Sequence, residues 1–378
     1  MDGFRCFGLP PVPCRQSVSD EVSKTPRTRA LIGVCFMLLL AGCASTHAVL
    51  HYEVDPATAK VWPQPPDPPH YRYIGEITGE QNIQASEQGK LASAGTRFFK
   101  WVLGLTSRRP DPVVLQRPQG VITDDSGRIY VTDVSRGAVY VFDQVAGKLS
   151  VWEMATAKDR FLTPIGIALG ANGEVLVTDA QHGYIARLNH DGHPIGALGR
   201  GQLSWPTGIA RDPASGRIYV AETHGHDIKV FNDSGQLLQT IGKRGMAPGE
   251  FNSPTFLTLA NGKLYVTDTL NARVQVLSLD GKPLQTVGRR GLNMGDMPRP
   301  KGVAVDKDGN IYVVESYYDY LLIFNAAGQF LMPIGGTGSG VGEFYQPGGI
   351  WTDRNDRVYI ADTFNGRIVI LQLLKEGA

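Results

Sequence analysis

Three histidines, His182, His224 and His226, are the side chains of this sequence whose type and number best suit metal chemistry. Three imidazole ligands with an open fourth position can hold a catalytic zinc ion, which activates water or polarises a substrate. All three come from two neighbouring stretches of the chain, however, and histidines in surface loops are commoner than metal ligands. We therefore expect no cofactor and keep zinc as the alternative. The sequence contains no nucleophile elbow and no phosphate-binding loop.

Lysines and arginines form a second group that recurs between short apolar runs. Clustered cations attract an anionic polymer, peptide or protein. The alternative is that they are ordinary solubilising residues, paired in part with acids such as Glu250 and Asp296. Together with two adjacent tyrosines, the candidates for ligand binding are Arg108, Arg109, Arg136, Arg200, Lys243, Arg244, Arg289, Arg290, Tyr317 and Tyr318.

Six acidic residues each end a short apolar run. A ring of carboxylates could hold a metal, but a carboxylate at the end of a strand also accepts hydrogen bonds from nearby backbone amides or from arginine. Because one acid occurs in every repeat of the chain, we expect a structural role for Asp133, Asp179, Glu222, Asp268, Glu315 and Asp362.

The elements that must position these residues are internal repeats. Each repeat begins with a short apolar strand, a turn containing Gly or Asn, and a second strand such as Ile311-Tyr312-Val313-Val314-Glu315. A third and a fourth strand follow. Four short strands in repeats of this length are typical of a β-propeller blade. Pro-x-Gly anchors lie 42 to 48 residues apart, counting a degenerate copy at Pro254, and begin at Pro118, Pro164, Pro206, Pro300 and Pro347.

Six copies of the hairpin seen at residues 308–313 resemble the NHL repeat family over about residues 117–378. The second copy, with Leu176 in place of the usual Tyr, is the weaker match. The resemblance implies an all-β, six-bladed β-propeller. In such a ring, the loops between blades and those between second and third strands open on one face, which would collect the candidate ligand residues.

The last repeat supplies only three strands before the chain ends. An open blade would leave an unpaired edge, which natural β proteins avoid. Residues 71–77 begin Tyr71-Arg72-Tyr73-Ile74-Gly75, and an apolar residue followed by Gly also ends the fourth strands elsewhere. We therefore expect this N-terminal segment to complete blade six, so that the propeller spans residues 71–378.

Two enzyme families with six-bladed propellers can be tested against the sequence. Gluconolactonase- and paraoxonase-like enzymes hold a divalent cation in the central channel, but the predicted innermost strands here, such as Gly302-Val303-Ala304-Val305, carry no Asp, Glu, Asn or His. Peptidyl-hydroxyglycine amidating lyase, closer to NHL propellers, uses zinc held by His with help from Tyr and Arg. A zinc-dependent lyase or hydrolase of this type is the alternative function.

Two segments precede the first blade. Residues 79–116 form an insert in which Leu91, Phe98 and Leu105 recur at helical spacing, which predicts a short helix that covers one rim or lies on a membrane surface. Residues 43–70 include five prolines in positions 63–69, which predicts a stiff, extended tether.

The N-terminus resembles a bacterial lipoprotein signal. A basic stretch precedes a short apolar run that closes with Leu40-Ala41-Gly42-Cys43. The resemblance implies cleavage after residue 42, lipid on Cys43 and, because Ala44 is not Asp, the outer membrane of a Gram-negative bacterium, facing the periplasm or exterior. Residues 1–21 are longer than such a signal needs, which suggests a start site placed too far upstream.

Composition limits the function classes. The net charge is +1 and 19% of residues are charged, so no overall field points to nucleic acid. An extracytoplasmic address also argues against RNA, which some NHL domains bind. We expect a lipoprotein that binds or scaffolds a protein, peptide or anionic ligand on one propeller face, rather than an enzyme.

Overall fold

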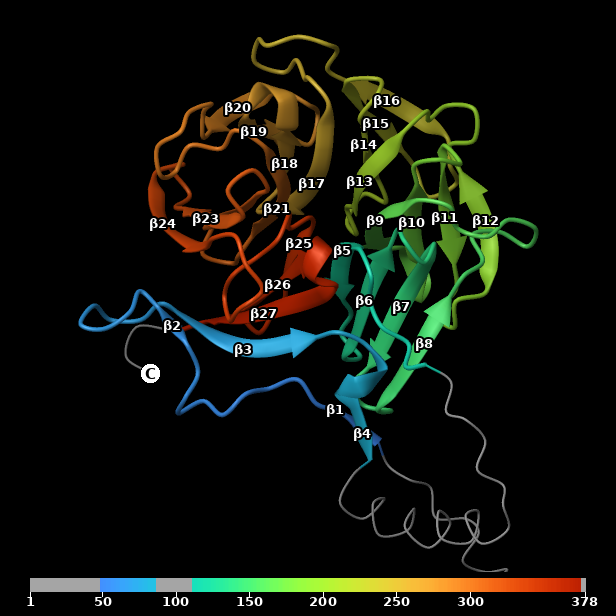
Figure 1. Cartoon of the computed structure of the whole chain (residues 1–378). Helices are drawn as coiled ribbons and strands as arrows, with labels where there is room; N and C mark the ends of the chain where they lie inside the picture. Colours follow the sequence, from blue (N-terminus) through green and yellow to red (C-terminus); the bar gives the residue numbers. More distant parts are fainter. Residues whose placement is uncertain (1–47, 86–110, 375–378) are drawn as a thin grey trace, which may run out of the picture. The chain divides into compact units, whose positions relative to one another are not determined.

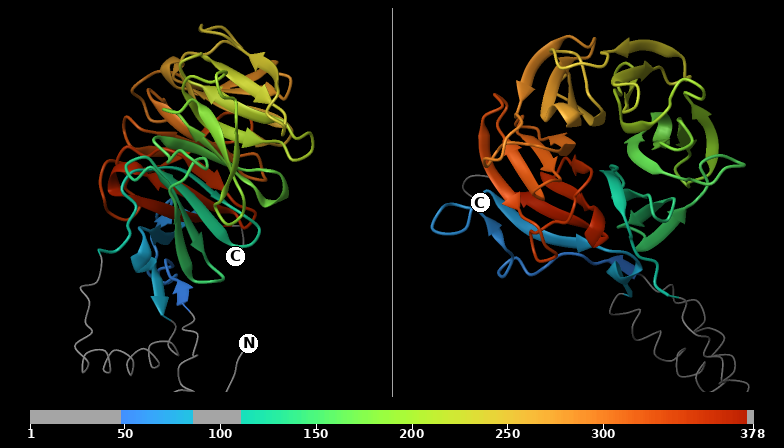
Figure 2. Two further views of the ribbon diagram at one scale, coloured as in Figure 1. Left: turned by 90° about the vertical axis from the view of Figure 1, so that its right-hand side faces the viewer. Right: turned by 45° about the horizontal axis from the view of Figure 1, so that its top comes forward.

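The computed structural model describes residues 48–85 and 111–374, all of which belong to one compact unit, Thr46–Ala378. Six antiparallel sheets surround a central channel, as the right-hand view of Figure 2 shows. The predicted six-bladed, all-β propeller is confirmed. No helix in the described ranges is long and apolar enough to cross a membrane.

Blades one to five each contain four consecutive strands, ordered from the channel outward (Figure 1). Blade one contains β5 (Pro118–Thr123), β6 (Arg128–Asp133), β7 (Ala138–Asp143) and β8 (Lys148–Trp152). Blade two contains β9 (Pro164–Leu169), β10 (Val175–Asp179), β11 (Tyr184–Leu188) and β12 (Pro194–Leu198). Blade three contains β13 (Pro206–Arg211), β14 (Ile218–Glu222), β15 (Asp227–Phe231) and β16 (Leu237–Ile241). Blade four contains β17 (Pro254–Ala260), β18 (Lys263–Asp268), β19 (Arg273–Ser278) and β20 (Pro283–Val287). Blade five contains β21 (Pro300–Val305), β22 (Ile311–Glu315), β23 (Tyr320–Phe324) and β24 (Phe330–Gly335).

Blade six joins the two ends of the chain. Its C-terminal strands are β25 (Ile350–Thr352), β26 (Arg357–Asp362) and β27 (Arg367–Leu373). Strand β3 (Tyr71–Ile77) pairs antiparallel with β27, as predicted, and thereby supplies the outer strand. This pairing closes the ring. It also covers the edge of β27, whose backbone donors and acceptors would otherwise be exposed.

Residues 48–70 pack on the propeller. They do not form the stiff, extended tether that the sequence predicted over residues 43–70. Strand β2 (Val61–Trp62) pairs with the start of β3, so the proline-rich stretch is the loop of a hairpin. Strand β1 (Ala48–Leu50) pairs with β4 (Ile83–Ala85). Proline lacks an amide donor, but it is tolerated in a loop and beside an edge strand, and this explains the difference. Residues 43–47 lie outside the described ranges.

The predicted helical insert, residues 79–116, is described only at its two ends. A 3-10 turn, η2 (Glu80–Asn82), leads into β4, and residues 111–116 lead into blade one. The positions that predicted the helix fall within residues 86–110, which the described ranges do not include.

The core consists of the middle strands of each blade, whose apolar side chains pack between neighbouring sheets. Tyrosines of the second strands are buried, and in blades one, five and six the hydroxyl donates to an Asp in the turn before the strand: Tyr130 to Asp124 at 2.8 Å, Tyr312 to Asp306 at 2.8 Å and Tyr359 to Asp353 at 3.0 Å. Threonine hydroxyls also join blades, since Thr132 donates to the Ile165 carbonyl of the next blade at 2.7 Å. The blades are thus fixed to one another by apolar packing and by buried polar contacts.

Candidate binding face

The propeller has two faces with different loops. We call the loop face the side that carries the loops between blades and those between second and third strands; the turn face carries the remaining turns. On the loop face the two loop types contact each other: Arg290 donates to the Leu270 carbonyl at 2.6 Å, and Asn271 donates to the Gly245 carbonyl at 2.8 Å.

The six acids that end the second strands hold the loop face together. Asp133, fully buried, accepts backbone N–H bonds from Gln116 and Arg117 with one oxygen and from Ser135 and Arg136 with the other, at 2.6 to 3.1 Å. The other five acids are also buried, and each accepts a backbone amide of the loop that enters its blade. Asp179 and Glu315 also accept backbone amides of the loop after the second strand. Each acid therefore supports loops, in keeping with the structural role expected from the sequence.

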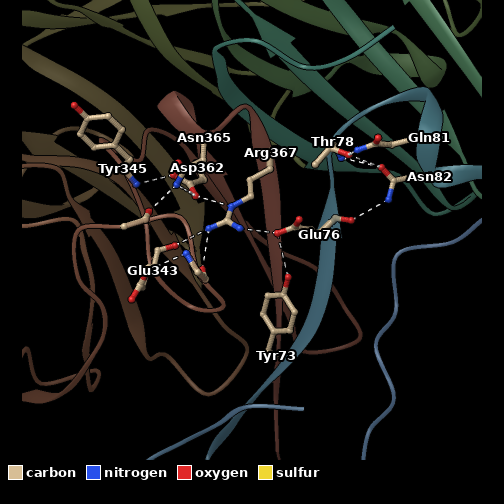
Figure 3. A network of polar contacts seen from close by, with 12 residues as sticks. Tyr73, Glu76, Thr78, Gln81, Asn82, Glu343, Tyr345, Asp362, Asn365 and Arg367 are labelled. Carbon is tan, nitrogen blue, oxygen red and sulfur yellow. Dashed lines mark hydrogen bonds and ion pairs between the residues drawn. The ribbon is translucent and has the colours of Figure 1, made fainter. Parts of the chain in front are cut away.

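Blades four and six extend this contact into a larger network, drawn for blade six in Figure 3. Arg367 pairs with Asp362 at 2.8 Å and with Glu76 of β3 at 2.7 Å, so one guanidinium links β27 to the closing strand. In blade four, Arg273 pairs with Asp268 at the equivalent position, at 2.8 Å. These arginines are taken up by the scaffold and are not available to a ligand.

Four of the six predicted basic candidates that lie in the described ranges have acidic partners. Ion pairs join Arg136 to Glu153, Arg200 to Asp159, Lys243 to Glu250 and Arg289 to Asp296, at 2.9 to 3.4 Å. Asp296 has a pKa below its usual range because Arg289 and the Asn293 amide donate to it. The alternative raised from the sequence, pairing with Glu250 and Asp296, is what the geometry shows for Lys243 and Arg289.

The other two basic candidates in the described ranges have no acidic partner there. Arg244 has no side-chain ion pair or hydrogen bond in the described part of the chain, and Arg290 contacts only a carbonyl there. Arg108 and Arg109 lie outside that part. The described loop face over blades four to six therefore keeps positive charge that no acid balances.

Large apolar side chains are exposed on the same face, and apart from Tyr317 and Tyr318 the sequence did not predict them. Met246 is 77% exposed, Leu292 is 78% exposed and Tyr317 is 62% exposed. Isolated exposed apolar residues are ordinary, but a cluster on one face marks an interaction surface. We call the apolar patch the nine exposed residues in the loops of blades four to six: Met246, Leu270, Leu292, Met294, Tyr317, Tyr318, Val341, Tyr345 and Phe364.

A groove of about 230 Å³ lies within this patch, between blades four and five. Leu292, Met294, Tyr318 and Tyr320 line it, with Glu315 among its walls. The pKa of Glu315 lies above its usual range because burial outweighs the amide hydrogen bonds that it accepts. The predicted candidate Tyr318 is thus part of a groove that could receive one apolar side chain.

The three candidate zinc ligands have separate partners. His182 Nε2 lies 2.9 Å from the Arg160 carbonyl, the His224 ring stacks on Trp205 with centroids 5.0 Å apart, and His226 Nδ1 accepts the Ser253 N–H at 2.9 Å. Among the residues that the structure describes, no group of three or more His, Cys, Asp or Glu side chains could hold a metal ion.

The central channel forms a cavity of about 1170 Å³ that opens toward the turn face. Its walls include apolar residues of the inner strands, such as Val121, Ile167 and Val303. At its mouth, Arg354 pairs with Asp125 at 3.0 Å. The cavity therefore combines an apolar wall with an exposed ion pair at its mouth.

A comparison with protein families agrees with this architecture. A family described as DUF5128, a 6-bladed beta-propeller, matches residues 212–287 and 299–375. A curated relative, the tRNA-specific 2-thiouridylase MnmA of Thiobacillus denitrificans, is 26% identical over 190 residues, which are 48% of this chain and 47% of that protein. The chain spans about half the length of the curated relative it matches.

Several solved structures share the fold at low sequence identity. A gluconolactonase from Xanthomonas campestris is 17% identical, with a TM-score of 0.53 over 72% of this chain and 93% of the other. An auxiliary nutrient binding protein from Bacteroides thetaiotaomicron is 12% identical, with a TM-score of 0.55 over 69% and 70%. A virginiamycin B lyase from Staphylococcus aureus is 18% identical, with a TM-score of 0.50 over 68% and 95%.

At these identities the likeness concerns the fold and not the reaction. Six sheets in a ring, closed by an N-terminal strand, together with the family and structural matches, make this chain a six-bladed β-propeller.

Proposed function

We propose that the chain is a binding module whose loop face, over blades four to six, recognises a protein or peptide partner. The observation that carries this proposal is the apolar patch, which lies on the same loops as Arg244 and Arg290. A partner would bury the apolar side chains and could place acidic groups beside the cations. A fold neighbour named as an auxiliary nutrient binding protein is compatible with a binding role and says nothing of the ligand.

The patch is richer in Met, Leu and aromatic residues than an ordinary solvated surface. Aromatic and Met side chains are enriched at the centres of protein interfaces, where they fill pockets of the partner or receive its side chains. The groove beside Tyr318 is of a size for one apolar anchor. These features favour a protein or peptide over a small polar ligand.

Capture experiments with loop-face variants test the proposal. We expect Leu292→Ser with Met246→Ser to lose a partner that the wild-type chain recovers from extracts of its own cells, and Arg244→Glu with Arg290→Glu to weaken recovery. Leu331→Ser is the matched control, because Leu331 is 52% exposed but lies on the outer strand β24. Recovery unchanged by both loop-face pairs, or lost equally in the control, contradicts the proposal.

We further propose that Cys43 carries a lipid that anchors the module to a membrane outside the cytoplasm. The residues that support this are the basic stretch, the short apolar run and the Leu40-Ala41-Gly42-Cys43 sequence. In cell fractionation, Cys43→Ser should leave the membrane fraction. Retention of that variant in membranes would contradict the lipid anchor.

A further inference from the structure

Lys301 occupies an unusual place in the ring. It is the second residue of the inner strand β21, at the end of the strand nearest the loop face. The equivalent residues of the other blades carry no charge: Gln119, Ile165, Thr207, Thr255 and Gly348. Lys301 is half-buried, and its pKa lies below the usual range because of burial and the positive charges of Arg299 and Arg117.

Glycines bring blade six close to blade five on one side and to blade one on the other at this point. The Gly302 N–H donates to the Gly348 carbonyl at 3.0 Å, and the Gly349 N–H donates to the Gln119 carbonyl at 2.7 Å. A Cβ on Gly349 would lie 2.3 Å from the Gln119 carbonyl oxygen, so a larger residue does not fit there. Blade six thus places no side chain from Gly348 or Gly349 between Lys301 and the start of blade one.

The two arginines are held at the same end of the ring. The Arg117 amide donates to Asp133, and its guanidinium stacks on Phe364 with 4.7 Å between the guanidinium carbon and the ring centroid. The Arg299 amide donates to Glu315 at 2.9 Å. Their backbones are therefore fixed by buried acids, and both side chains are exposed at the loop face.

No acid balances these three cations in the described ranges. The side chains of Arg117, Arg299 and Lys301 have no ion pair and no hydrogen bond there. Asp296, the nearest acid along the chain to Arg299, pairs with Arg289 at 2.9 Å. Glu315 uses its oxygens on the amides of Arg299, Tyr317 and Tyr318. Three cations that repel one another are stabilised by an anion placed among them.

We propose that Arg117, Arg299 and Lys301 bind an anionic group, a carboxylate or a phosphate, carried by the ligand of the loop face. The inference rests on the proposed function and names the chemistry that it recognises. Phe364 and Tyr345, whose ring centroids are 5.5 Å apart, belong to the apolar patch and adjoin Arg117 through Phe364. The preferred ligand therefore presents its anion next to an apolar or aromatic side chain.

Lysine reactivity gives a direct test that needs no partner. The full-length protein is trace-labelled with an amine reagent, with and without added acetate or inorganic phosphate at matched ionic strength, and modification is quantified by mass spectrometry. We expect the anion to protect Lys301 and not the exposed Lys148 of β8. Protection at lower concentration by acetate identifies a carboxylate site, and by phosphate a phosphate site.

Variants separate binding from nonspecific screening. Arg299→Gln and Arg117→Gln should each raise the anion concentration needed for protection about tenfold, the loss expected for one charge-assisted hydrogen bond. Arg354→Gln, on the turn face, is the control and should leave protection unchanged. Thermal unfolding midpoints equal to wild type show that the variants fold.

The outcomes also distinguish this site from the proposed function. Absence of protection by either anion, or equal protection of Lys148, overturns the anion site even if the apolar patch captures a partner. Protection that depends on Arg117 and Arg299, without any partner lost in the loop-face variants, keeps the anion site and overturns the protein-binding proposal.

Discussion

Asp133 shows how one carboxylate organises two loops. Its oxygens accept four backbone amides, two from the loop that enters blade one and two from the loop after β6. A fully buried acceptor with that many donors cannot be replaced by water without moving both loops, so the acid determines the local shape of the loop face.

We expect Asp133→Ala to lower the free energy of unfolding by at least about 3 kcal/mol, because several buried amides would lose their acceptor. Asp125→Ala is the matched control, since its pair with Arg354 is exposed and should contribute less than about 1 kcal/mol. Urea unfolding measures both. Similar losses for the two variants would contradict a structural role for Asp133.

At the residue scale, the sequence predicted the structural role of the six buried acids, but it did not predict which surface residues are exposed or paired. A carboxylate repeated at the same place in every repeat points to the scaffold, and its partners lie within about one blade. The apolar patch could not be predicted, because exposure of Met246 or Leu292 depends on how far each loop projects from its neighbours. Ion pairs such as that of Arg200 with Asp159 join residues of different loops, so the partners could not be identified from the local sequence.

At the scale of elements, Gly75 explains why residues 48–70 pack on the ring. Gly75 lies in β3 with φ +154°, and a Cβ there would lie 1.6 Å from the Tyr52 carbonyl oxygen. The segment before β2 thus approaches the closing strand more closely than any side chain would allow. Proline content indicated an extended conformation but could not reveal this contact, which is why the tether prediction was wrong for residues 48–70.

Gly75→Ala should therefore destabilise the protein strongly. Gly196 of β12 is a matched control, since it lies in an outer strand with φ +159° and a Cβ there would meet no atom within 4 Å. We expect the loss for Gly75→Ala to exceed that for Gly196→Ala by at least about 2 kcal/mol, the cost of forcing atoms into a packed contact. Equal losses in chemical unfolding would show that residues 52–53 do not pack on β3.

At the scale of the whole molecule, buried tyrosines link stability to alkaline pH. Burial is the main cause that raises the pKa of Tyr71, Tyr140 and Tyr184 to about 12 from the usual 10.0. Above pH 10 the unfolded chain loses these protons first, so stability is complete below that pH and falls as the pH rises toward 12.

We expect base-induced unfolding to coincide with the ionisation of these tyrosines. Tyrosinate absorbance and far-ultraviolet circular dichroism, followed together from pH 9 upward, should change in one cooperative step. Ionisation of all tyrosines near the usual pKa with the dichroism unchanged would contradict this.

The fold itself was predictable because each blade repeats the same pattern, so weak local signals add up over the ring. Even the closing strand could be found, since a missing fourth strand and a matching segment upstream point to each other. What each face binds was not predictable to the same degree, because loops vary while strands are constrained by packing.

The pairing of β3 with β27 imposes an order in time on synthesis. Glu76 and its partner Arg367 are 291 positions apart. At about 5 to 20 residues per second, roughly 15 to 60 seconds separate their synthesis. Throughout that interval, blade six cannot form and residues 71–77 must wait without their partner strand. The edge of β3 that pairs with β27 therefore stays open to other partners until residues 367–373 have been made.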